Sequence, residues 1–144
     1  MFNQPIDQRL SEWADHRRQL DESKDPLQDV WDFWHQAPFT PHNKNIDPYH
    51  QKSWPSPWEI IAENIYDDFT KALMIGWTLK LTKQFKNSKI ELRTMVDTNR
   101  RREYNLVYID DKWILNYNDE GPVLTTEVIE QFELENLVEV QVPR

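Results

Sequence analysis

The sequence predicts an α+β fold, with helices in its N-terminal part and an antiparallel sheet in its C-terminal part. Apolar residues recur at helical spacing as far as about residue 84. From residue 90 onward they alternate with polar residues, as in strands that have one buried face. Aromatic residues make up 12% of a chain that is 38% hydrophobic, and their large side chains can fill its core. We therefore expect N-terminal helices and a Pro-rich arm, followed by a central helix packed on a small antiparallel sheet.

Two helices are expected near the N-terminus, at 6–20 and at 26–35. In the first, Trp13 belongs to an apolar stripe with helical spacing. In the second, Asp25 stands where an N-cap is expected and Pro26 stands at the first helical position, where no intrahelical N–H bond is needed. Both helices should therefore pack through one apolar face.

A Pro-rich stretch at 38–57 holds five of the nine prolines. It should be irregular, because proline lacks an N–H and restricts the residue before it. Loops of this length are uncommon in compact domains and are often functional. We take 1–55 as an N-terminal helical and Pro-rich arm, and 56–144 as a single compact core.

The clearest helix start is the stretch "SPWE". Ser56 is placed as the cap, Pro57 as the first helical residue and Glu59 as the partner in a capping box. Apolar residues continue along one face beyond it, so that one central helix is expected from 57 to about 84.

The remaining elements form the expected sheet. Asp110 and Asp111 separate two alternating runs, and Asp tolerates the left-handed angles that a two-residue hairpin turn requires. The expected strands are 90–97, 104–109, 112–117 and 137–142, with a turn at 98–101 and a short helix at 125–132.

Composition excludes several kinds of site. The chain has no Cys, which rules out disulfides, thiolate nucleophiles and thiolate zinc sites. His42, Asp47 and His50 share the Pro-rich stretch, but their spacing fits no standard zinc pattern, so we expect no metal and no cofactor. No apolar run approaches about 18 residues and the N-terminus is no signal peptide, so we expect no membrane segment and a cytoplasmic location.

Two stretches, "YDDFTKAL" and "REYNLVYIDDKW", carry a resemblance to a known family over about residues 57–118. The pairing of a capped helix with this hairpin resembles the transglutaminase-like branch of the papain-like superfamily. In that family a Cys precedes an Asp-Phe step at the start of the central helix, and a His and an Asp lie on the hairpin. The resemblance implies a helix packed on an antiparallel sheet with a site between them.

The positions that match the family's catalytic triad are occupied here by Tyr66, Arg102 and Tyr117. A phenol with a pKa of about 10 is a poor substitute for a thiol, and an arginine cannot accept a proton. Thiol-protease chemistry needs a nucleophile and a base within hydrogen-bond reach. If the resemblance holds, the chain is a scaffold without its triad, and we expect it not to be an enzyme.

Charge is unevenly spread along a chain of net charge −8. The stretch 80–102 carries eight Lys and Arg against two acids, and 119–144 carries seven acids against one Arg. The net acidity, with no stacking motif beside the basic stretch, argues against nucleic acid and favours an acidic protein surface, such as the acidic C-terminal segment of another copy. The candidate interface residues are Trp31, Trp34, Trp54, Trp58, Arg100 and Arg101.

These observations favour a non-enzymatic protein–protein interaction or assembly component, whose partner is another protein or further copies of itself. The Gly-poor, Asn-rich composition is similar to that of small tailed-phage proteins, which suggests a virion or host-takeover component in the host cytoplasm or the virion. Two alternatives stay open. One is an enzyme with an unrecognised site between the central helix and the hairpin, using Asp68, Arg102 or Tyr117. The other is a regulatory binder of nucleic acid or of a polymerase through the basic stretch at 80–102.

Overall fold

The computed structural model describes residues 1–128 and 132–143, and these form an α+β fold as predicted. Its helices are α1 (Ile6–Glu22), α2 (Pro26–Trp34), α3 (Pro57–Glu63) and α4 (Asp68–Lys80), with 3-10 turns at Gln51–Ser53 and Thr125–Glu127. Its strands are β1 (Ile90–Asp97), β2 (Arg102–Ile109), β3 (Trp113–Leu115), β4 (Val123–Leu124) and β5 (Glu133–Glu139).

The five strands form one antiparallel sheet in the order β4-β3-β2-β1-β5. The predicted hairpin between β2 and β3 is confirmed, because Asp110 and Asp111 both adopt left-handed angles, with φ of 53° and 57°. Thr94 of β1 lies opposite Asn105 of β2, so these two side chains share one face of the sheet. That face meets the helices.

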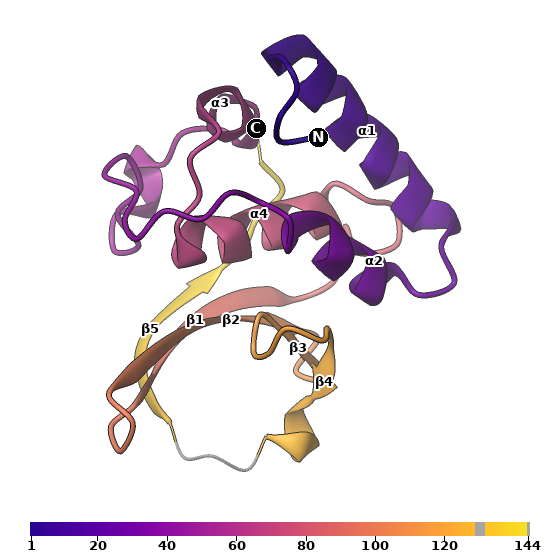
Figure 1. Cartoon of the computed structure of the whole chain (residues 1–144). Coiled ribbons are helices and arrows are strands. Elements are labelled where there is room, and N and C mark those ends of the chain that lie inside the picture. Colours follow the sequence, from indigo (N-terminus) through magenta and orange to yellow (C-terminus); the bar gives the residue numbers. More distant parts are fainter. Residues whose placement is uncertain (129–131, 144) are drawn as a thin grey trace.

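Helix α4 lies between the sheet and the other helices (Figure 1). Nearly all of its residues are buried, as expected for a helix that is apolar on most sides. The indole N–H groups of Trp13 in α1 and Trp34 in α2 both donate to Thr78 Oγ1 of α4, at 3.0 and 3.1 Å. One buried cluster therefore combines side chains from 1–55 with those of the central helix and sheet.

The expectation of one helix from 57 to 84 is wrong, because two helices meet at a bend. The predicted capping box of Ser56 and Glu59 starts α3, but Asn64 takes a left-handed conformation at φ 60° and ends it. Tyr66 then forms an isolated parallel β-bridge with Phe39 of the Pro-rich stretch. This bridge uses backbone hydrogen-bonding groups that a continuous helix would need. Asp67 caps the new helix α4, which ends at Lys80.

Two other boundaries differ from expectation. Asp25 occupies the N-cap position of α2, but its side chain makes no capping hydrogen bond, since its backbone angles are not those of a standard cap. The last strand is Glu133–Glu139 and not 137–142, because pairing with β1 ends where Val140 packs beside Gly76 of α4.

The expected helix at 125–132 is a 3-10 turn where the structure describes it, and 129–131 lie outside the described residues. The 3-10 turn at Thr125–Glu127 lies on the side of the sheet that faces away from α4 (Figure 1). A second apolar cluster fills this side of the sheet, with Leu106 and Ile114 at its centre and Phe132 packed against it.

Among the described helices, none is long and apolar enough to cross a membrane.

Candidate functional site

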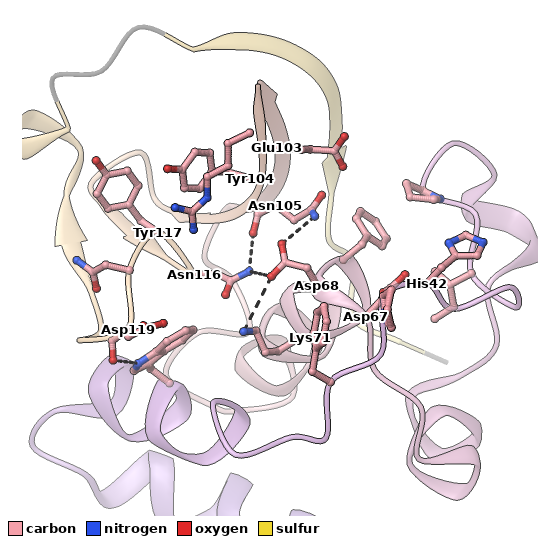
Figure 2. A pocket seen from close by; sticks show the side chains of 18 residues that line it. His42, Asp67, Asp68, Lys71, Glu103, Tyr104, Asn105, Asn116, Tyr117 and Asp119 are labelled. Atoms are coloured by element: carbon pink, nitrogen blue, oxygen red, sulfur yellow. Dashed lines mark hydrogen bonds and ion pairs between the residues drawn. The ribbon is translucent and has the colours of Figure 1, made fainter. Parts of the chain in front are cut away.

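A polar cleft of about 710 Å³ opens at the N-terminal end of α4, between that helix, the strands β2 and β3, and the Pro-rich stretch (Figure 2). Four carboxylates line it against two permanent cations, Lys71 and Arg102. The carboxylates belong to Asp67, Asp68, Glu103 and Asp119. The described lining of the cleft therefore has a surplus of negative charge.

Asp68 lies at the centre of the cleft and is held by two amide side chains (Figure 2). Asn105 Nδ2 donates to Asp68 Oδ2 at 2.9 Å, and Asn116 Nδ2 donates to Asp68 Oδ1 at 3.1 Å. Lys71, one helical turn further on, places its Nζ 4.0 Å from Oδ1. A carboxylate offers about four lone-pair sites, so Asp68 keeps the capacity to accept from a ligand.

Local structure fixes the position of Asp68. It is the first residue of α4, and the preceding Asp67 caps the helix by accepting from Thr70 N at 2.7 Å. The other oxygen of Asp67 accepts from the backbone N–H of Asn43 at 3.0 Å, which ties the Pro-rich stretch to the start of the helix.

The two asparagines are positioned by the sheet. Asn105 occupies a helix-facing position of β2, and its Oδ1 accepts from Thr94 Oγ1 at 3.1 Å. Asn116 follows β3 in a left-handed conformation with φ 68°, which ends that strand earlier than the expected residue 117. Its Nδ2 also donates to the Asn105 carbonyl at 2.9 Å, so this amide links the end of β3 to both β2 and α4.

Electrostatics at the cleft favour a cation. The pKa of Glu103 is raised, chiefly by partial burial and then by the negative charges of Glu135 and Asp68. A bound positive group would relieve this repulsion. At the mouth of the cleft, Phe39 presents an aromatic ring that is 74% exposed.

The three positions matched to the catalytic triad do not meet. Tyr66 is buried against Phe2 and Trp34, away from the cleft, and burial raises its pKa far above the ordinary value. Its hydroxyl has no hydrogen-bond partner among the described residues. Arg102 and Tyr117 do line the cleft, where both pack against the ring of Tyr104.

The interface candidates are spread over the molecule. Trp31 and Trp34 are buried in the core, so in this structure neither ring is presented to a partner. Trp54 is half-buried against Phe69 and Trp77, and Trp58 lies partly exposed against Trp13. The two arginines are exposed in the turn before β2, where Arg100 Nε lies 3.7 Å from Asp97 and Arg101 has a left-handed φ of 51°.

Several basic side chains of the stretch 80–102 form hydrogen bonds or ion pairs with other residues of the same chain. Lys80 is buried and donates to the Ser88 carbonyl at 2.9 Å. Lys89 and Arg93 both form ion pairs with Glu91 and Asp111. The acidic strand β5 pairs with β1 of the same chain, so the acidic and basic stretches already meet in one molecule.

His50 in the Pro-rich stretch and Glu63 at the end of α3 make local contacts. His50 Nδ1 lies 3.2 Å from Asp47 Oδ2, and Glu63 accepts a hydrogen bond from Asn45. Within 1–128 and 132–143, no group of three His, Asp or Glu side chains is arranged to hold a metal ion.

Asn105 and Asn116 are site residues that were not predicted from the sequence. One signal was available, because Asn105 alternates with Val107 and Ile109 on the face of a strand that is otherwise apolar at those positions. No pattern in the sequence indicated that Asn116 would lie at the site.

Comparison of the chain with protein-family models, with curated proteins and with solved structures finds no match.

Proposed function

We propose that the chain is a non-enzymatic protein–protein interaction or assembly component, and that its cleft binds a lysine or arginine side chain of the partner. One observation carries the proposal: two amides hold the Asp68 carboxylate at the centre of a cleft with surplus negative charge. A carboxylate with free lone pairs in a partly desolvated cleft is a strong acceptor for a charged donor.

The groups that converge in the cleft support a binding role over acyl transfer. Acyl transfer by a side chain requires a nucleophile beside a base that can take its proton. Among the described residues of the sheet, only Asn105 and Asn116 donate hydrogen bonds to Asp68, and an amide cannot take up a proton near neutral pH. If the chain has a transglutaminase-like scaffold, Tyr66, Arg102 and Tyr117 stand at the triad positions, and the cleft holds a carboxylate and two amides beside them.

The form of the cleft supports a partner with a projecting basic side chain. A guanidinium or ammonium can reach Asp68 and at the same time reduce the repulsion among Asp68, Glu103 and Glu135. The exposed ring of Phe39 at the mouth offers an apolar contact for the stem of that side chain.

A titration with N-acetyl-arginine methylamide, followed by NMR, tests the proposal. We expect the side-chain amide signals of Asn105 and Asn116 to shift, and the neutral citrulline analogue to leave them unchanged. Asp68→Asn keeps the size of the side chain but removes its charge, and should weaken binding about thirtyfold, the equivalent of about 2 kcal/mol.

Asp15→Asn is the matched control. Asp15 also pairs with a basic residue three positions on, Arg18, but it belongs to α1 and does not line the cleft. It should leave the titration unchanged. Equal shifts with the citrulline analogue, or no shift at all, would contradict the proposed cation site.

A second assay separates binding from catalysis. Incubation with acyl-ester probes and with amine donors plus glutamine substrates should give no labelling of Tyr66 or Asp68 and no isopeptide product. Labelling that Asp68→Asn abolishes would instead favour the alternative, an enzyme that works in the same cleft.

A further inference from the structure

Strand β5 forms one edge of the sheet and is open along one side. Six of its seven residues pair with β1, Glu135 lying at a register shift, and among the described residues no strand pairs with its other side. The strand is seven residues long, and most of its side chains are exposed. Unpaired edges of this kind can accept a further strand.

On the side away from β1, the β5 backbone has hydrogen-bonding groups that no described residue pairs with. The N–H of Val140, just beyond the strand, donates to the Ile90 carbonyl at 2.8 Å. In an antiparallel ladder, the backbone N–H and C=O groups of successive residues point alternately toward the neighbouring strand and away from it. Residues 137 and 139 therefore direct their N–H and C=O groups away from β1, to the open side.

Two leucines extend this edge as an apolar strip. Leu137 lies opposite Arg93, and Leu134 lies opposite Met95, so both are on the face of the sheet that turns away from α4. A register shift between Thr94 and Met95 brings them to the same face. Leu134 is 53% exposed and Leu137 is 43% exposed.

Three glutamates determine which strand can pair there. Glu133, Glu135 and Glu139 are exposed, and none of them forms an ion pair within the part of the chain that the structure describes. In a symmetric antiparallel pair of two copies centred on Asn136, Glu133 would face Glu139 twice. Like charges directly opposite each other are destabilising, whereas opposite charges stabilise the pair. The edge therefore disfavours a second copy and favours a basic strand.

We propose that the open edge of β5 binds, by strand addition, an extended segment of another protein that has Lys or Arg at its ends and β-branched residues between them. Backbone hydrogen bonds to residues 137 and 139 provide the affinity. Contacts with the exposed leucines and pairing with the terminal glutamates provide the specificity. This edge adjoins the cleft, because Asn136 Nδ2 donates to the carbonyl of the cleft residue Pro48 at 3.1 Å and the charge of Glu135 contributes to the raised pKa of Glu103. The inference uses the β5 backbone and its terminal glutamates and not Asp68, so it does not depend on the function proposed for the cleft.

A fluorescein-labelled peptide, Lys-Val-Thr-Val-Thr-Val-Lys, is the probe, and fluorescence anisotropy with the full chain measures its binding. We expect saturable binding that weakens as salt is added. Replacing both lysines with glutamate should abolish binding. N-methylation of alternate backbone nitrogens, on the side that would face β5, should also abolish it, because it removes the donors of the ladder.

The double variant E133K/E139K should bind the basic peptide about tenfold more weakly and should bind the glutamate-ended peptide instead. Glu22→Lys, at the exposed end of α1, is the control for a charge reversal away from this edge and should bind as the unmodified chain does. Asp68→Asn should also bind the peptide normally, which separates this surface from the cleft.

Three results would overturn the inference. The first is unchanged affinity for the N-methylated peptide, since binding would then not use the backbone of the edge. The second is equal affinity of E133K/E139K for the basic peptide. The third is a dimer in analytical ultracentrifugation that this double variant disrupts, because the edge would then serve a second copy of the chain.

Discussion

His16 shows how burial alters the chemistry of a single side chain. Its ring stacks on Phe33 with centroids 3.9 Å apart and is only 8% exposed. Burial lowers its pKa from 6.5 to about 4, although the nearby charge of Asp29 acts in the opposite direction. The folded chain therefore holds this histidine neutral, in a small pocket that it shares with Asp29 and Asp32.

Stability should consequently fall as the solution is acidified from about pH 6.5 to pH 4. Above 6.5 the histidine is neutral in both states. Between 6.5 and 4 the unfolded chain takes up a proton that the folded chain excludes, and below 4 both states are protonated. The loss amounts to about 3 kcal/mol in total, measurable by urea denaturation at a series of pH values.

The variant His16→Phe should lose this part of the pH dependence, because phenylalanine keeps the stack with Phe33 but does not titrate. His50→Gln serves as the control, since His50 lies exposed in the Pro-rich stretch, and it should follow the unmodified chain. A pH profile of His16→Phe identical to that of the unmodified chain would exclude His16 as the cause.

The start of α4 depends on a cap that joins two elements. Asp67 accepts from Thr70 N at 2.7 Å, from Thr70 Oγ1 at 2.6 Å and from Asn43 N at 3.0 Å. The same carboxylate therefore begins a helix and anchors the Pro-rich stretch. Asp25 occupies the corresponding position of α2, but its side chain makes no such bond.

Replacing these two caps by alanine should give unequal losses. Asp67→Ala leaves up to three donors without an acceptor and should lower the free energy of unfolding by about 2 kcal/mol. Asp25→Ala should lower it by no more than about 0.5 kcal/mol, because no side-chain cap is lost. Chemical denaturation of both variants measures the difference, and equal losses would contradict the role assigned to Asp67.

Thr78 joins three helices through one buried hydroxyl. Its Oγ1 accepts from both indoles, Trp13 in α1 and Trp34 in α2, and donates to the Met74 carbonyl at 2.6 Å. The N-terminal helices are thus fixed to the central helix by polar contacts as well as by apolar packing. The hydroxyl makes the N-terminal segment part of the core of the whole molecule.

Thr78→Val replaces the hydroxyl with a methyl group and leaves two buried indole N–H groups without an acceptor. We expect it to lower the free energy of unfolding by about 3 kcal/mol. Thr78→Ser keeps the hydroxyl and should lose only about 1 kcal/mol for the missing methyl group. Equal losses for the two variants in urea denaturation would show that the hydroxyl does not bind the helices together.

Local patterns were sufficient to predict the fold class and most element starts. The capping box at Ser56 and the hairpin turn at Asp110 depend on neighbouring residues alone, and both were correct. The strand at 90–97 followed from the alternation of side chains, which is a property of the extended backbone. The end of α3 at Asn64 was missed, because its bend is stabilised by the bridge between Phe39 and Tyr66, 27 positions apart by number (66 minus 39).

The candidate site could not be read from the chain in the same way. Asp68 and Asn105 are 37 positions apart, and Asp68 and Asn116 are 48 apart. The amides meet the carboxylate only because strand register sets which residues of β2 and β3 face α4, and because the helix starts at Asp68 and not earlier. Backbone propensities act over a few residues, so they determine the helices, turns and strands one by one. The meeting of side chains from different elements depends on how the core packs, and packing is a property of the folded chain.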